Sequence, residues 1–276
     1  MARLQWAKFP TMWLKPPQAS ADGAKARSPL TELMWARHAG TGIAAILVLM
    51  ALAIRLNQSY KDRVAGGTIE RTNTIAVTFE DLRKMTGLAK GSISKALMLL
   101  ESFQALEVVH QGRSNSYKLL GLDVAGGWCM LPHGWLLKSD GTLKTFAKIP
   151  RNRVTLNALK AYVALMHLRD NKLNTAAASF TAIERWTGIR REEIATALST
   201  LAALQLVRVS PDRDFRHSKG DNSHRYSIIG LGEGHAVVND EDLVSRQTTP
   251  EGIVVTTPAM RVVDPLPPPP SAAKSL

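Results

Sequence analysis

The sequence predicts a mainly α-helical α+β fold in which two copies of one small domain follow each other, each ending in a small β-hairpin. An internal repeat is the first observation, because the segments that begin at Phe79 and Phe180 align over thirty positions, 101 residues apart. The second observation is that apolar residues recur at helical spacing in both copies. The third is that a short segment in which apolar and polar residues alternate, as in a β-strand, follows them in both copies. A repeat of this length is too long for a solenoid unit and indicates two complete domains. Nine aligned positions are identical: Phe79/Phe180, Thr86/Thr187, Gly87/Gly188, Ile93/Ile194, Ala96/Ala197, Leu97/Leu198, Leu100/Leu201, Gln104/Gln205 and Val108/Val209.

In the first copy, Phe79, Leu82 and Met85 form the apolar face of a short helix. Gly87 interrupts that helix, since glycine adopts positive φ without steric cost. A second helix then carries an apolar stripe at i, i+3, i+4 and i+7, which we expect to be buried. The members of that stripe are Ile93, Ala96, Leu97, Leu100 and Gln104. Two helices across a glycine-containing turn are the helix-turn-helix pattern.

A β-hairpin follows over residues 106–120, with turn residues at its centre. Each copy also needs a preceding helix, which residues 43–56 and 156–168 supply. The first of these helices is apolar enough to raise the question of a membrane span. Its apolar run before Arg55 is only about fifteen residues, against the ~20 that a bilayer requires. We therefore expect a core helix and no membrane association.

Two helices, a turn and a hairpin with a basic tip resemble the winged-helix family of DNA-binding proteins. The resemblance lies in TGLAKGSISKALMLLESFQALEVV with HQGRSNSYKL, and in TGIRREEIATALSTLAALQLVRV with SHRYSI. It covers residues 37–122 and 155–231 and implies two tandem winged-helix domains. Family members often carry Ser or Thr before the second helix, where the side chain caps exposed N–H groups. Ala89 and Arg190 stand near that place, so we expect a shifted or less well capped helix start.

The chain divides into five parts on this basis. Residues 1–36 form a basic arm that either docks on a partner or DNA, or lies as an ordered strap over the first domain. The first winged-helix domain is residues 37–122, and the second is residues 155–231. A connector of residues 123–154 joins them, with an extended strand in its segment WCMLPHGWLL. Residues 232–276 are a polar, proline-rich tail that we expect to be disordered.

The balance of charge favours a nucleic-acid partner. The chain carries a formal net charge of +12. Residues 1–30 hold five basic and one acidic side chain, and residues 236–276 hold three basic and five acidic ones, which leaves +10 on residues 31–235. Excess positive charge on the two repeats is what binding to phosphates requires.

Catalytic and cofactor motifs are missing from the sequence. There is no P-loop, no dinucleotide-binding glycine pattern, and no HExxH, CxxC or GxSxG sequence. The single cysteine, Cys129, excludes a disulfide framework and a zinc finger. We therefore expect a non-enzymatic protein without cofactor or metal. No signal peptide is evident, so the expected location is the cytoplasm, in association with the bacterial nucleoid or a plasmid.

The resemblance places DNA contacts on the second helix and the wing of each copy. In the first copy the second helix turns Lys95 away from the buried stripe, and lysine and serine bond base edges or phosphates. The candidates there are Lys90, Ser92, Ser94 and Lys95 on the helix, with Arg113, Asn115 and Lys118 in the wing.

The second copy differs, because Glu192 and Glu193 stand on the turn expected to meet DNA and would repel phosphates. We expect the first copy to read bases with its helix. The second copy either grips the backbone with its wing or serves as an interaction domain. Its candidates for DNA contact are Arg190, Arg191, Arg213, Arg216, Lys219 and Arg225.

The predicted function is sequence-specific binding of double-stranded DNA. Tandem winged helices resemble the architecture of plasmid replication initiators, which favours an origin-binding initiator of a plasmid or other mobile element. A transcription regulator of the same architecture is the alternative, and a protein–protein adaptor in a nucleoprotein assembly is the second alternative. Further partners to expect are a second copy of the chain, as a dimer, or replication and transcription proteins.

Overall fold

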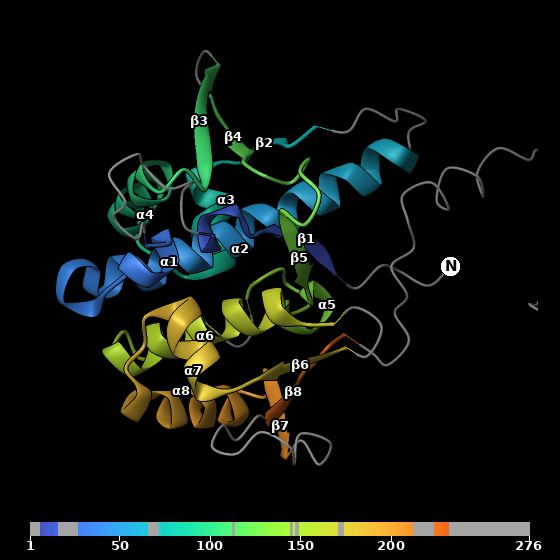
Figure 1. Cartoon of the computed structure of the whole chain (residues 1–276). Coiled ribbons are helices and arrows are strands. Elements are labelled where there is room, and N and C mark those ends of the chain that lie inside the picture. Colours follow the sequence, from blue (N-terminus) through green and yellow to red (C-terminus); the bar gives the residue numbers. More distant parts are fainter. Residues whose placement is uncertain are drawn as a thin grey trace, which may run out of the picture. The chain divides into compact units, whose positions relative to one another are not determined.

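The computed structural model describes residues 6–15, 27–65, 72–111, 114–143, 146, 149–170, 174–211 and 224–231. The predicted tail, residues 232–276, and residues 16–26 of the arm lie outside these ranges. The fold is α+β with small sheets, as the sequence predicts (Figure 1).

The first repeat contains a long helix, a short strand, two further helices and a hairpin. These elements are α2 (Trp35–Ala65), β2 (Thr74–Ala76), α3 (Phe79–Thr86), α4 (Lys90–Ser102), β3 (Leu106–Gln111) and β4 (Ser114–Leu119). The strands form an antiparallel sheet of order β2-β4-β3, so the strand between α2 and α3 pairs with the returning strand of the hairpin.

The second repeat has the same element order and the same sheet topology. Its elements are α6 (Arg153–Leu168), β6 (Thr175–Ala178), α7 (Phe180–Thr187), α8 (Arg191–Ala203), β7 (Val207–Pro211) and β8 (His224–Ile228). The sheet order is β6-β8-β7, again antiparallel. The sequence repeat is therefore also a repeat of structure.

Several residues that are identical in the two repeats have the same backbone role in both. The hydroxyl of Thr86 donates to the carbonyl of Leu82 at 2.6 Å and accepts from the N–H of Leu88 at 3.3 Å. Thr187 makes the same two bonds in the second repeat, at 2.6 and 3.2 Å. Gly87 and Gly188 then end their helices in the left-handed region, with φ of 67° and 64°.

Gln104 and Gln205 are a second pair of identical residues at equivalent positions of the two repeats. Both follow the end of the second helix with positive φ, 53° and 54°. Gln104 is exposed and lies beyond Ser102, so its predicted place on the buried stripe is wrong. The helical period was extended past the real helix end, where the chain reverses into β3. The other four members of the stripe are buried as predicted.

The central part of helix α2 is apolar on every side and is covered by the protein on every side. Every residue from Ile43 to Ile54 is buried. The helix packs against α4 of its own repeat, α6 of the second repeat, and β1 (Ala7–Pro10). By length and composition the segment Trp35–Ser59 is able to cross a membrane, but 78% of its apolar 18-residue stretch is buried within the protein. A helix that is apolar all round is typical of a core position. The helix bends at Ala39, which has non-helical dihedral angles.

The two repeats share this core. Lys160 on α6 is 2% exposed, and its ammonium donates to the carbonyl of Leu33 at 2.9 Å. Leu33 is the C-cap of α1 (Pro29–Glu32), so the lysine binds at the negative end of that short helix. The same arm segment reaches the second repeat, where α1 packs against α7.

The described part of the arm is ordered against the body. Strand β1 pairs antiparallel with β5 (Trp128–Leu131), and a short 3-10 helix, η1 (Met12–Leu14), follows it. Trp6 stacks on Trp128 at 5.8 Å between ring centroids. These contacts are those of the strap alternative. The connector strand is shorter than predicted, because Pro132 ends it and α5 (His133–Leu136) follows.

Candidate nucleic-acid interface

Helix α4 has one buried face and one open face. The stripe that includes Ile93 and Leu97 packs into the core, while Lys90, Ser94 and Lys95 are exposed. Ser92 is half-buried on the flank. The N-cap of α4 is Ala89, and no side chain caps the helix start. The first N–H groups of α4 thus have no capping side chain, in line with the less well capped helix start that the sequence predicts.

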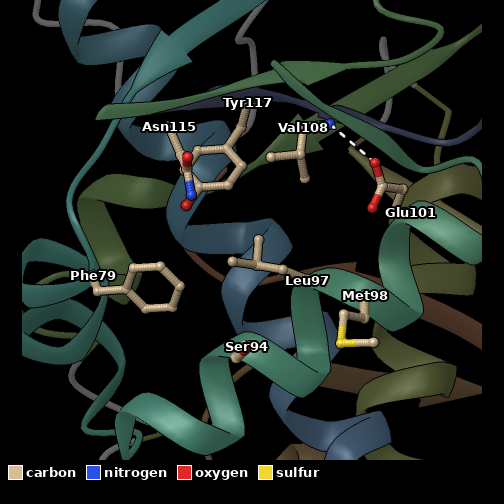
Figure 2. A pocket seen from close by; sticks show the side chains of 8 residues that line it. All are labelled: Phe79, Ser94, Leu97, Met98, Glu101, Val108, Asn115 and Tyr117. Carbon is tan, nitrogen blue, oxygen red and sulfur yellow. Dashed lines mark hydrogen bonds between the residues drawn. The ribbon is translucent and has the colours of Figure 1, made fainter. Parts of the chain in front are cut away.

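A pocket of about 230 Å³ lies between α4 and the β3–β4 hairpin (Figure 2). Its walls come from three elements, namely the start of α3, one edge of α4 and the inner side of the hairpin. At one end, the Lys90 ammonium lies 5.8 Å from the ring centroid of Phe79, within range of a cation–π contact. At the other, a Glu101 carboxylate oxygen accepts from the N–H of Val108 at 3.4 Å. The lining residues are Phe79, Ser94, Leu97, Met98, Glu101, Val108, Asn115 and Tyr117.

The hairpin register decides which predicted wing residues reach this pocket. Val108 pairs with Tyr117, and both line the pocket. Side chains alternate along a strand, so Asn115 shares the face of Tyr117 and Lys118 lies on the opposite face. The Lys118 ammonium is 3.4 Å from the carboxylate of its cross-strand partner Glu107. Asn115 is therefore at the pocket, Lys118 is not, and Arg113 lies outside the described residues.

In the second repeat, the start of α8 carries two exposed arginines. Arg190 is the N-cap and, like Ala89, makes no side-chain cap. Arg191 is the counterpart of Lys90, and its guanidinium donates to the Thr181 hydroxyl at 2.9 Å. The two equivalent helix starts thus both carry basic residues and are both uncapped by side chains, but the start of α8 also carries two glutamates.

The two glutamates at the start of α8 do not act together. Glu192 is exposed. Glu193 turns back onto α6, where one carboxylate oxygen lies 2.6 Å from the guanidinium of Arg153 and the other accepts from Asn157 at 3.3 Å. The expectation that both carboxylates would face DNA is therefore wrong for Glu193. Its partners, the charged Arg153 and the polar Asn157, come from α6, which lies outside the aligned segments of the repeat.

The second hairpin buries Tyr226 where the first buries Tyr117. Burial raises the pKa of the Tyr226 phenol to about 12, so the side chain is neutral at physiological pH. His224 lies between two aromatic rings, 6.0 Å from that of Phe180 and 6.3 Å from that of Tyr226. Strand alternation places Arg225 on the other face, half-buried. The remaining wing candidates, Arg213, Arg216 and Lys219, lie outside the described residues.

The turns before α4 and α8 differ in their surroundings. Among the described residues, no atom of another segment lies within 4 Å of the place that a Cβ at Gly87 would occupy. At Gly188, such a Cβ would lie 3.1 Å from the carbonyl oxygen of Thr31 in the arm. The arm thus touches one side of the turn of the second repeat, where Gly188 remains exposed, and no described segment approaches the corresponding glycine of the first repeat. Nothing local in the sequence indicates this contact, which joins segments far apart in the chain.

The described residues contain neither a metal-binding cluster nor an exposed thiol. Among them, no group of three or more His, Cys, Asp or Glu side chains is placed to hold a metal ion. Cys129 is buried, and burial raises the pKa of its thiol to about 12, which disfavours the nucleophilic thiolate.

Comparison with known proteins adds no relative. No protein-family model matches the chain, and no curated protein is significantly similar to it in sequence. The function therefore has to be inferred from the geometry of the two repeats.

Proposed function

We propose that each repeat is a winged-helix domain and that the chain binds double-stranded DNA sequence-specifically, without catalysis. The element order supports this, since each repeat has three helices, a strand between the first two, and a terminal hairpin. The observation that carries the proposal is the start of α4. There, Lys90, Ser94 and Lys95 are exposed on a helix whose opposite face is buried in the core. A helix fixed in this way presents its N-terminal turns to the major groove.

The two repeats divide the work in this proposal. The first reads base edges, because lysine bonds guanine O6/N7 and serine bonds either base edges or phosphates. The second positions the protein on the backbone through Arg190, Arg191 and its wing, since its helix offers Thr196 where the first offers Lys95. Phosphate contacts give register and affinity, and base contacts give specificity.

A specific observation also favours an adaptor role for the second repeat. Thr31 lies against Gly188, so the arm occupies one side of the turn that leads into α8. In this alternative, the second repeat makes no DNA contacts and binds another protein instead. The salt dependence of DNA binding separates the two, because an adaptor repeat adds no phosphate contacts.

We further propose origin binding by a plasmid or other mobile element as the process, with transcription regulation as the alternative. Support comes from the shared core, since α2 packs on α6 and holds the two repeats as one unit. Two domains fixed in this way suit sites in a constant spacing and orientation. Many direct repeats of the selected site beside the gene favour the initiator, and one inverted repeat in its own promoter favours the regulator.

The testing experiment is selection of bound duplexes from a random library, followed by a salt titration on the selected site. We expect one enriched sequence and an affinity that falls steeply with salt, by about 0.9 logarithmic units per tenfold salt for each phosphate contact. Absence of enrichment, or a flat salt dependence, would overturn DNA binding.

A further inference from the structure

Met98 on α4 is the most exposed of the large apolar side chains in the part of the chain that the structure describes. Its exposed fraction is 68%, against 47% for Val124 and 44% for Met34. Single exposed apolar residues are common on protein surfaces. Met98 differs from the others in its place, because it stands on the edge of α4 that borders the pocket.

Along this edge the side chains form a row. Lys90, Ser94 and Met98 are spaced i, i+4 and i+8, so each lies one turn above the last. The row runs from the uncapped helix start toward the hairpin. In Figure 2, Ser94 and Met98 lie on successive turns of α4, with Leu97 between them on the inner side. Consecutive members are about 6 Å apart along the helix axis.

The pocket beside Met98 is lined by both apolar and polar side chains. Leu97, Val108 and the rings of Phe79 and Tyr117 supply its apolar part, and Ser94, Glu101 and Asn115 supply its polar part. Met98 borders this mixed pocket and is itself largely exposed to solvent. Its unbranched, polarizable side chain adapts to a small apolar group that approaches from the solvent side.

We infer that Met98 determines base specificity by contacting the 5-methyl group of thymine in the major groove. This inference rests on the proposed DNA-binding function. Thymine is the base that presents an apolar group in the major groove, while the other base edges present hydrogen-bond donors and acceptors. Lys90 and Ser94 supply polar contacts on the same edge of the helix, and Met98 supplies the apolar one.

The second repeat provides an internal contrast. Ser199 on α8 is the counterpart of Met98, and it is exposed. The second repeat therefore offers a hydroxyl at the place where the first offers a thioether. The substitution Met98→Ser gives the first repeat the same residue as the second at this position. Because Met98 is largely exposed, the substitution leaves the core unchanged.

The test uses the full-length protein and its selected duplex, with each thymine replaced in turn by deoxyuridine, which lacks only the 5-methyl group. For the wild type, we expect about fourfold weaker binding at one or two positions, the factor for losing one buried methyl contact. For Met98→Ser, binding to the thymine duplex falls by a similar factor, and replacement by deoxyuridine at those positions has no further effect. The matched control Met34→Ser removes another exposed methionine and keeps the wild-type response.

The outcomes separate the inference from the function on which it rests. If no duplex is enriched or bound, the proposed function fails and the inference with it. If the duplex binds but no thymine position responds, the role of Met98 is overturned while DNA binding stands. The same holds if wild type and Met98→Ser respond equally to deoxyuridine, since the methyl group would then contact another side chain.

Discussion

The two repeats of this chain share a backbone and differ in what surrounds it. Both end their first short helix at a glycine with positive φ, and both begin the next helix without a side-chain cap. In the first repeat the turn is open and the helix start carries lysine and serine. In the second repeat, Thr31 of the arm lies against Gly188 in the turn, and Glu193 is paired with Arg153 of α6. The two copies thus keep residues that shape the backbone and differ in the side chains around the start of the second helix.

The largest expected effect concerns the two helix starts. Lys90→Ala with Lys95→Ala removes two charged contacts, so we expect about 3 kcal/mol, or a hundredfold, weaker binding to the selected site. Arg190→Ala with Arg191→Ala should weaken binding to selected and random duplexes by equal factors, because those contacts go to phosphates. Competition binding with both duplexes measures this. A larger loss of sequence preference in the arginine variant would reverse the roles assigned to the two repeats.

A second comparison concerns α2 and α6, the first helix of each repeat. Helix α6 buries a lysine, Lys160, while the buried residues of the central part of α2 are apolar. Burial lowers the pKa of Lys160 to about 8 from an ordinary value of 10.5. Between these values the unfolded chain binds more protons than the folded one, so the contribution of Lys160 to stability rises with pH. We expect a gain of about 3 kcal/mol from pH 8 to pH 10.5 relative to Lys160→Met, measured by urea unfolding.

The reference variant is necessary because Cys129 acts in the opposite direction. Burial raises the pKa of its thiol, so the unfolded chain loses that proton first and stability falls as pH rises. The difference between wild type and Lys160→Met isolates the lysine. Parallel pH profiles for the two proteins would mean that the ammonium is better solvated than its 2% exposure indicates.

The sequence predicted the repeated elements well because its signal is local. The buried stripe of α4, the glycine turn and the hairpin each follow from spacing within a few residues. Strand alternation also separates two of the predicted wing contacts, since Asn115 shares the face of Tyr117 and Lys118 lies on the opposite face. This parity can be read from the sequence, and the prediction of both residues as wing contacts leaves it out. No local sequence pattern indicates the pairing of β1 with β5 or the contact of Thr31 with Gly188. Those features depend on segments that meet only after folding.

The two glycine turns provide a matched pair of substitutions. Alanine at Gly87 or Gly188 has to adopt a left-handed conformation, at a cost of about 1–2 kcal/mol. Gly188→Ala also brings a methyl group close to the backbone of Thr31, so we expect roughly 1 kcal/mol of further destabilisation. Denaturant unfolding of both variants measures the difference. Equal losses would show that the arm yields at this contact.

The smallest expected effect separates the two glutamates of α8. Glu193→Gln removes the negative charge that pairs with Arg153. The side chain of Glu193 is 25% exposed and that of Arg153 is 47% exposed, so we expect a loss of at most about 1 kcal/mol in stability. Glu192→Gln should leave stability unchanged and DNA affinity equal or higher, because an exposed negative charge is removed. Thermal unfolding and binding titrations of the two variants decide this. Loss of preference at a cytosine with Glu192→Gln would instead assign that carboxylate to base reading.

The all-round burial of α2 has a consequence for how the chain can be divided. One side of this helix is covered by α6, so removing the second repeat would expose a long apolar surface to water. An isolated first repeat would then hide that surface by pairing with another copy of itself or by aggregating. Each repeat thus depends on the other to cover its apolar surface. We therefore expect neither half, expressed alone, to remain a monodisperse monomer.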